Sequence, residues 1–456
     1  MSKITRKKNR LPLIIFGLIL ICILIYNIPY VNEKLAWRLD DLRTQVVYFF
    51  NPPDKAVFIP EQQGQIDKIV TATFEAMERI TPTASVVKIT STPLPIASPT
   101  AAIPPAPASF TNPGVTYVDQ HGRWNYCGPA NITMALNFWG WKGNRDDVAK
   151  VVKPGINDKK MEFIDRGKSD KNVMPYELVD FVNNHTDLHA LQRFGGDINL
   201  LKRLISSGFP VVIEKGYYER DYMGKIAWMG HYLFVTGYDD AKDGFIVQDA
   251  WLVPGKNLVS KYDEFANGWR NFNYLFMIVY PADKESKVYD ILGNWGDPKW
   301  ADQNALDTAS REVKTLTGID AFFAWFNKGT SHVQLLEYVD AASAYDEAFN
   351  IYATLGEGAT QRPYHMMWYQ TWPYRAYFYT GRYQDVIDLA NTTLLKTIDK
   401  PTLEESLYWR GMAEQASGNL SAAIADYQTA NHLNPKMSAI IDVLQSLGLK
   451  PETPVN

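Results

Sequence analysis

Cys127 is the residue of this sequence best placed for nucleophilic chemistry. It precedes Gly128 and Pro129 in the stretch NYCGPANITMALNFWGW, and the chain has only one other cysteine, Cys22. Proline is favoured in the first helical turn, so we expect a helix to begin at or just after Cys127. The free N–H groups and the dipole of a helix N-terminus favour a thiolate, which is the nucleophilic form of cysteine. A buried and inert cysteine is the alternative.

A thiolate nucleophile needs a general base, and His231 is the first candidate among the seven histidines. It follows Gly230 and opens the apolar run HYLFVTGYDD, which predicts a strand. Asp249 lies in the next predicted strand, FIVQDAW, and the intervening DDAKDG predicts a hairpin loop. Paired strands would bring the carboxylate close to the imidazole and let it orient the ring. A surface histidine at a strand end is the alternative.

Gln120 is the candidate oxyanion donor. It lies shortly before Cys127, so its side-chain amide could act together with the Cys127 backbone N–H. A surface glutamine is the simpler interpretation of Gln120. The sequence implies no metal ion and no organic cofactor.

Residues 114–283 are expected to form one α+β domain. Helical patterns come first, in ANITMALNFWG, PYELVDFVNNH and DINLLKRLISSG, and the last of them should end at Gly208. Apolar runs typical of strands follow, in PVVIEKGYY, HYLFVTGYDD, FIVQDAW and NYLFMIVYP. Helices followed by strands favour an antiparallel sheet over a doubly wound parallel one.

Five motifs carry a resemblance to a known family: Gln120, CGPA at 127–130, GFPVV at 208–212, GHY at 230–232 and VQDAW at 247–251. In this order they resemble the C-39-type cysteine peptidases of the papain-like clan, which include the bacteriocin leader peptidases. The resemblance implies a papain-like fold and hydrolysis of peptide bonds. It also implies the roles of nucleophile, proton carrier, orienting acceptor and oxyanion donor for Cys127, His231, Asp249 and Gln120. The sequence departs from the family in a longer Gln-to-Cys spacing and in Ala250, where proline is usual. Because of the longer spacing, His121 and Asn125 are alternatives to Gln120 near the oxyanion.

The N-terminal segment predicts attachment to a membrane. Residues 1–10 form a basic tail, and residues 11–31 are free of charge and long enough to cross a bilayer as a helix. The basic side stays in the cytoplasm, so the bulk of a single-pass cell-membrane protein would be extracytoplasmic. A cleaved signal peptide is the alternative. Residues 32–80 predict a juxtamembrane helical stalk, and the Pro/Ser/Thr/Ala-rich residues 81–113 predict an extended linker.

The C-terminal part is predicted to be all α-helical. After a connector at 284–312, residues 313–456 show small and aromatic residues at recurring positions and resemble tetratricopeptide repeats. Such an array would hold a protein partner, or would only support the first domain. An unrelated helical bundle is the alternative. The clearest copies are WFNKGTSHVQLLEYVDAASAYDEAFNIY, YRAYFYTGRYQDVIDLA and SGNLSAAIADYQTANHLNP.

Together these patterns favour a membrane-anchored extracytoplasmic cysteine peptidase acting on a peptide or protein. The net charge of −4 argues against binding to nucleic acid. Two other functions fit the same residues. One is a non-catalytic peptide- or protein-binding module on a peptidase fold. The other is a different thiol hydrolase or acyltransferase, such as a cell-wall amidase or a transglutaminase-like enzyme.

Overall fold

The computed structural model describes residues 57–60, 106–123, 125–153, 171–220, 226–356, 362–364, 366–397 and 403–452, with isolated positions between 17 and 50. The predicted basic tail, most of the predicted anchor and stalk, and residues 81–105 of the predicted linker lie outside these residues. Within the part that is described, no helix is both long and apolar enough to cross a membrane.

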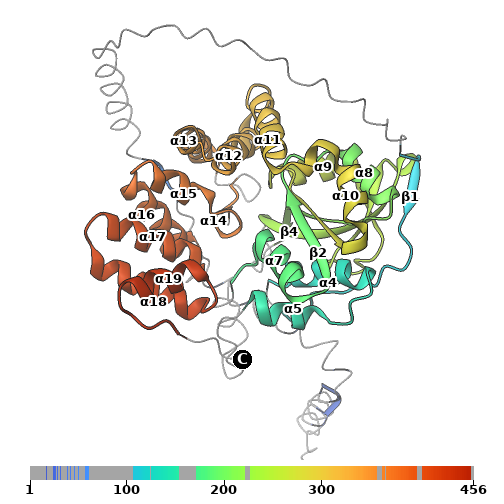
Figure 1. The fold of residues 1–456 in the computed structure, drawn as a ribbon, viewed down its shortest axis with the longest axis horizontal. Helices are drawn as coiled ribbons and strands as arrows, with labels where there is room; N and C mark the ends of the chain where they lie inside the picture. The colour runs from blue at the N-terminus through green and yellow to red at the C-terminus, as the bar shows by residue number, and fades with distance from the viewer. Residues whose placement is uncertain are drawn as a thin grey trace, which may run out of the picture.

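An antiparallel sheet forms the centre of the first domain (Figure 1). The strand order is β2-β7-β3-β4-β5-β6, and β1 pairs with β4. The hairpin between β4 and β5 is the one that DDAKDG predicts, with a short turn at Asp240–Lys242. The strands span Ser109–Thr111 (β1), Leu188–Arg193 (β2), Val211–Arg220 (β3), Ile226–Asp239 (β4), Gly244–Gln248 (β5), Leu258–Lys261 (β6) and Phe276–Pro281 (β7).

Helices cover both faces of this sheet because its central strands are apolar on both sides. Val212, Phe234 and Met277 pack under α4, α5 and α7. The alternate residues Val211 and Val235 pack under α8, α9 and α10. These helices span Cys127–Phe138 (α4), Arg145–Val152 (α5), Pro175–His185 (α7), Ile198–Ser206 (α8), Tyr262–Arg270 (α9) and Glu285–Leu292 (α10). The antiparallel α+β architecture expected for this region is therefore present.

The folded domain extends beyond 114–283 at both ends. Residues 109–111, assigned above to the linker, form β1 and pair with 237–239 of β4. The side chain of Asn112 is buried and donates to the carbonyl oxygens of Ile205 and Thr236. At the other end, α10 buries Val288 and Leu292 against the sheet, so this part of the predicted connector belongs to the domain core.

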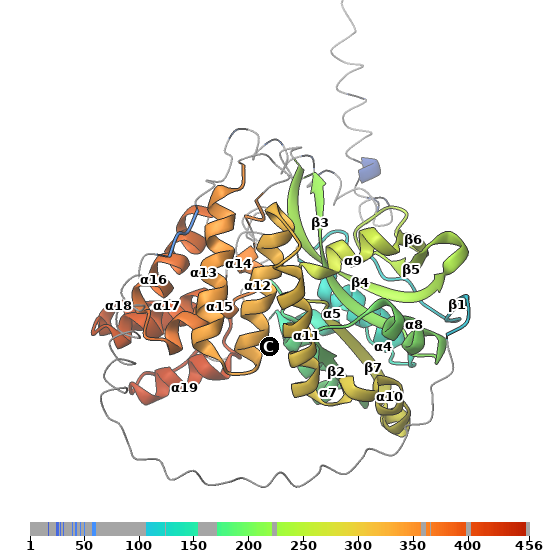
Figure 2. The ribbon, with the colours of Figure 1, turned by 90° about the horizontal axis from the view of Figure 1, so that it is seen from above.

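The described residues from Pro298 onward are mostly helical, and they lie beside the sheet domain in both views (Figures 1 and 2). We call this part the helical region. Its helices span Pro298–Glu312 (α11), Gly318–Gln334 (α12), Tyr338–Thr354 (α13), Met366–Tyr369 (α14), Trp372–Tyr379 (α15), Tyr383–Asn391 (α16), Glu404–Ala416 (α17), Leu420–Leu433 (α18) and Ser438–Ser446 (α19).

Two helix pairs of this region share the same close contact. A β-carbon on Gly329 of α12 would lie 2.7 Å from the ring of Tyr345 in α13. A β-carbon on Gly411 of α17 would lie 2.7 Å from the ring of Tyr427 in α18. Glycine and tyrosine have the same separation along the chain in both pairs. This matches the packing expected of the predicted repeats, whose assignment as tetratricopeptide repeats stays a prediction.

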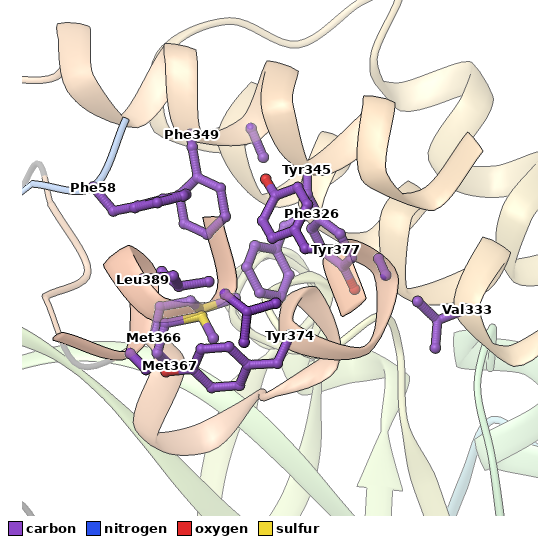
Figure 3. Close-up of a cluster of buried hydrophobic side chains, with 14 of the residues drawn as sticks. Phe58, Phe326, Val333, Tyr345, Phe349, Met366, Met367, Tyr374, Tyr377 and Leu389 are labelled. Atoms are coloured by element: carbon purple, nitrogen blue, oxygen red, sulfur yellow. The ribbon is translucent and has the colours of Figure 1, made fainter. Parts of the chain in front are cut away.

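A short N-terminal segment belongs to the core of the helical region. Phe58 is 5 % exposed and makes an edge-to-face contact with Phe349, with ring centroids 5.1 Å apart (Figure 3). Its ring also lies 6.2 Å from that of Tyr377. Part of the predicted stalk is therefore docked on α13 and α15.

Candidate active site

Helix α4 places Cys127 at its first position, as the sequence predicts. The side-chain amide of Asn131 donates to the carbonyl oxygens of Cys127 and Tyr232, both at 2.9 Å, and so joins the start of the helix to β4. Cys127 is 7 % exposed. The thiol therefore lies at the positive end of a helix dipole, against the central strand of the sheet.

His231 and Asp249 come together through the β4–β5 hairpin. Phe234 pairs with Gln248 in register, and Asp249 follows directly after β5. Nε2 of His231 lies 2.9 Å from Oδ1 of Asp249. The same oxygen accepts the backbone N–H of Trp251 at 2.8 Å, which fixes the carboxylate. The sequence suggested that His231 lies at the start of its strand. This was wrong, because β4 begins at Ile226.

The thiol and the imidazole interact directly. Cys127 and His231 are close enough for each side chain to shift the pKa of the other. Because Nε2 of His231 faces Asp249, the ring nitrogen left for the sulfur is Nδ1. The structure therefore joins three of the four predicted site residues in one chain of contacts, which we call the Cys127 cluster: Cys127, His231 and Asp249.

The pKa values within the Cys127 cluster favour separated charges. Burial raises the pKa of the Cys127 thiol, but the hydrogen bond and charge of His231 and the N–H groups of Tyr232 and Gly128 outweigh it, so the pKa is lowered. Burial lowers the pKa of His231, but the charge and hydrogen bond of Asp249 and the contact with Cys127 raise it to about 10. Burial likewise raises the pKa of Asp249, and His231 outweighs it and keeps that pKa low. A thiolate beside an imidazolium is the state that these shifts favour.

Gln120 lies beside the hairpin end that carries Asp249. Its backbone N–H donates to the carbonyl oxygen of Ala250 at 2.9 Å. Its side chain is 8 % exposed, and Oε1 has no hydrogen-bond partner among the described residues. Next to it, Nε2 of His121 lies 2.8 Å from the carbonyl oxygen of Trp251. The role of Gln120 as oxyanion donor stays a prediction.

Two further residues lie close to the thiol and were not predicted. Glu214 on β3 is 1 % exposed, and its pKa is raised well above its usual value by burial and then by the charge of Cys127. Tyr369 comes from α14 and packs on Gly230, where a β-carbon would lie 2.7 Å from its ring. The space beside Gly230 is thus filled by Tyr369 and Phe272. A lone carboxylate in the apolar run PVVIE was the available signal for Glu214, while none marked Tyr369.

One other cluster of ligand-type side chains lies away from this site. His332, Glu337 and Asp340 bring their ligand atoms within 4.8 Å of one another near the start of α13. Both carboxylates are exposed, and Nδ1 of His332 lies 2.7 Å from Oε2 of Glu337. An ordinary surface ion pair accounts for this arrangement, so we assign it no role.

Comparisons with known proteins give two similarities, one to a solved structure and one to a family model. A crystal structure described as that of a C39-like peptidase from Bacillus anthracis is similar at 15 % identity and a TM-score of 0.29, over 38 % of this protein and 96 % of that one. No curated protein matches the sequence. Residues 113–277, which contain the Cys127 cluster and Gln120, match the sequence model of the Peptidase_C39 like family.

Proposed function

We propose that this protein is a cysteine peptidase that uses the Cys127 cluster to hydrolyse peptide bonds. The observation that carries the proposal is the continuous contact from the Cys127 thiol through His231 to Asp249. It lies within the residues that match a peptidase family. A cysteine at a helix start, hydrogen-bonded to an imidazole that a carboxylate orients, is the arrangement that thiol hydrolases require.

In the proposed mechanism, the Cys127 thiolate attacks the carbonyl carbon of the scissile bond. The oxyanion that forms is stabilised by the Cys127 N–H and by the Gln120 amide, each contributing about 3 kcal/mol. The His231 imidazolium donates its proton to the leaving amine, which leaves an acyl thioester. His231 then takes a proton from water, hydroxide attacks the thioester, and Cys127 is released. Asp249 holds the imidazole in the orientation that both steps need.

Labelling with a thiol-directed peptidase inhibitor tests the nucleophile. The chain has two cysteines, so Cys22→Ala is a matched control for Cys127→Ala. We expect the Cys22→Ala protein to be labelled and to cleave members of a peptide library, and the Cys127→Ala protein to do neither. Equal labelling of both variants would show that the nucleophile is assigned wrongly. Labelling at Cys127 without cleavage of any peptide would favour another thiol hydrolase, and peptide binding without labelling would favour a binding module.

We also propose that residues 11–31 anchor the protein in the cell membrane and leave the catalytic part outside the cytoplasm. The support is the uncharged run from Leu11 to Val31 after a basic tail. Removing residues 1–31 should move the protein from the membrane fraction to the soluble fraction.

We propose in addition that the helical region holds a protein partner, which its repeated helix pairs support. Crosslinking in intact cells, with and without residues 313–456, would test this.

A further inference from the structure

A cavity of about 390 Å³ lies between the sheet domain and the helical region. The sheet domain contributes Tyr176, Phe194 and Phe272 to its walls. The helical region contributes further aromatic side chains, among them Trp372 and Trp409. Pockets of this size, with apolar walls and a few polar groups, are typical of ligand sites. Neither part of the molecule forms this pocket alone.

Buried polar contacts hold the two walls together. Lys171 of the sheet domain lies 2.6 Å from Glu177 and 3.3 Å from Glu404 of α17. The hydroxyl of Tyr176 donates to Glu405 at 2.5 Å. Because breaking a buried ion pair is strongly unfavourable, these contacts fix the position of the helical region beside the sheet.

Two buried polar atoms of residues that line the cavity have no hydrogen-bond partner among the described residues. They are Oε1 of Gln192, at the end of β2, and Nε of Arg375, on α15. A buried polar atom without a partner costs about 1–3 kcal/mol. The lining is mainly apolar and rich in aromatic side chains, with a few polar residues such as Gln192 and Arg375, which points to a ligand that is largely aromatic and has a polar edge.

The cavity adjoins the Cys127 cluster. Glu214 and Tyr369 both line it, and the charge of Cys127 contributes, after burial, to raising the pKa of each of them. Tyr369 packs on Gly230, the residue before His231. Glu214 faces Tyr232 across the β3–β4 pair, and Tyr232 packs on Gly128, next to the thiol. The same two side chains thus belong both to the wall of the pocket and to the surroundings of the nucleophile.

We propose that this interdomain cavity binds an aromatic side chain of the peptide substrate, next to the bond that Cys127 cleaves. The proposal rests on the peptidase function only in assigning the peptide as a substrate. An aromatic ring would make edge-to-face and stacking contacts with the cavity walls. Gln192 and Arg375 would bind the hydroxyl of tyrosine, the N–H of tryptophan or a water beside phenylalanine. The helical region thereby becomes part of the specificity pocket.

Direct binding tests the pocket separately from catalysis. Full-length Cys127→Ala protein would be titrated by calorimetry with short capped peptides that differ only by phenylalanine, tyrosine, tryptophan or alanine at one position. We expect the aromatic peptides to bind about 10- to 100-fold more tightly than the alanine peptide, from the burial of one aromatic side chain. Equal affinity for all of these peptides would overturn the proposal. Aromatic preference without any turnover by the unmodified protein would overturn the peptidase function and leave the pocket intact.

A pair of neighbouring substitutions locates the binding site. Ala439 of α19 lines the cavity, whereas Ser438 beside it is exposed. Ala439→Trp should fill the pocket and abolish the aromatic preference, and Ser438→Trp should retain it. Retention in both variants would place the aromatic side chain elsewhere and overturn the proposal. If Ala439→Trp does not fold, Trp372→Ala, which removes part of an aromatic wall, should weaken binding of the aromatic peptides alone, and unchanged binding would count against the pocket.

Discussion

The helical region contains a buried charge cluster that makes an instructive contrast with the Cys127 cluster. Arg382 donates to Asp346 at 2.6 and 2.9 Å and to Asp385 at 2.7 Å. The hydroxyl of Tyr377 donates to Asp346 at 3.0 Å. These contacts join α13, α15 and α16. Burial and ion pairing alone therefore do not distinguish this cluster from the Cys127 cluster.

The difference lies in which groups can exchange a proton near neutral pH. A guanidinium stays protonated throughout the physiological range, so Arg382 can only hold its partners in place. A thiol with a lowered pKa beside an imidazole can lose and regain a proton as a reaction proceeds. The carboxylates differ as well. Burial raises the pKa of Asp346, whereas the charge of His231 keeps the pKa of Asp249 low. The predictions below test this distinction between chemistry and structure.

Asp249→Asn should have the largest effect on catalysis. The neutral amide can still orient the ring but no longer stabilises the imidazolium charge, so we expect kcat on a peptide substrate to fall by about 10²-fold. The matched change in the other cluster, Asp346→Asn, should lower stability and leave kcat of the folded protein unchanged. Steady-state kinetics on both variants, corrected for the folded fraction, makes the comparison. A similar fall in kcat for both would mean that the two clusters do not differ in the way proposed.

Arg382→Met should destabilise the fold without changing the chemistry. Removing the cation leaves two buried carboxylates uncompensated, a change that typically costs about 3–5 kcal/mol in the free energy of unfolding. Urea unfolding followed by circular dichroism would measure this, with the exposed Lys450→Met as a control. A loss of less than about 1 kcal/mol, the range of exposed ion pairs, would show that the cluster is not a structural element.

Much of the Cys127 cluster could be predicted because its positions are encoded locally. A proline two residues after Cys127 fixes a helix start, and a short turn sequence fixes the hairpin that brings Asp249 to His231. Each of these signals spans only a few residues, so the sequence displays it directly. The same holds for helix α8, which ends before Gly208 with that glycine in the left-handed conformation at φ 92°.

The rest depends on contacts between distant parts of the chain. Tyr369 reaches the site from the helical region, and Phe58 reaches the helical region from the far N-terminal side. Neither stands in a pattern that would reveal its partner. The short strands β2 and β6 were also missed, because runs of four to six residues with mixed polarity are held by their neighbours in the sheet.

The pH dependence of activity gives a smaller and more specific test. The ion pair exists only while His231 is protonated, so kcat/KM should fall about tenfold per pH unit above pH 10. In Asp249→Asn this alkaline limb should move to lower pH, because the charge that raises the pKa of His231 is lost. The protonated His231 also stabilises the fold. This contribution to the free energy of unfolding is complete below pH 6.5, the ordinary pKa of histidine, and is lost as the pH rises through about 10. An alkaline limb that does not move in Asp249→Asn would contradict the assignment.

Gly411→Ala should have the smallest effect, and it tests whether close packing shapes the helical region. The added methyl group would lie 2.7 Å from the ring of Tyr427, which is fully buried and cannot move away easily. Overpacking of about 1–3 kcal/mol is partly offset by the better helix propensity of alanine, so we expect a net loss of about 1 kcal/mol in the free energy of unfolding.

A double variant decides whether that loss comes from the contact with Tyr427. Tyr427→Leu alone should destabilise the fold by leaving space, whereas Gly411→Ala added to it should cost nothing or restore some stability. The two changes would then be coupled, as substitutions at touching residues are. Strictly additive effects would show that Gly411 is required for a reason other than close approach of α17 and α18. In that case the shared glycine–tyrosine spacing of the two helix pairs would lose its explanation, whereas the Cys127 cluster would be unaffected.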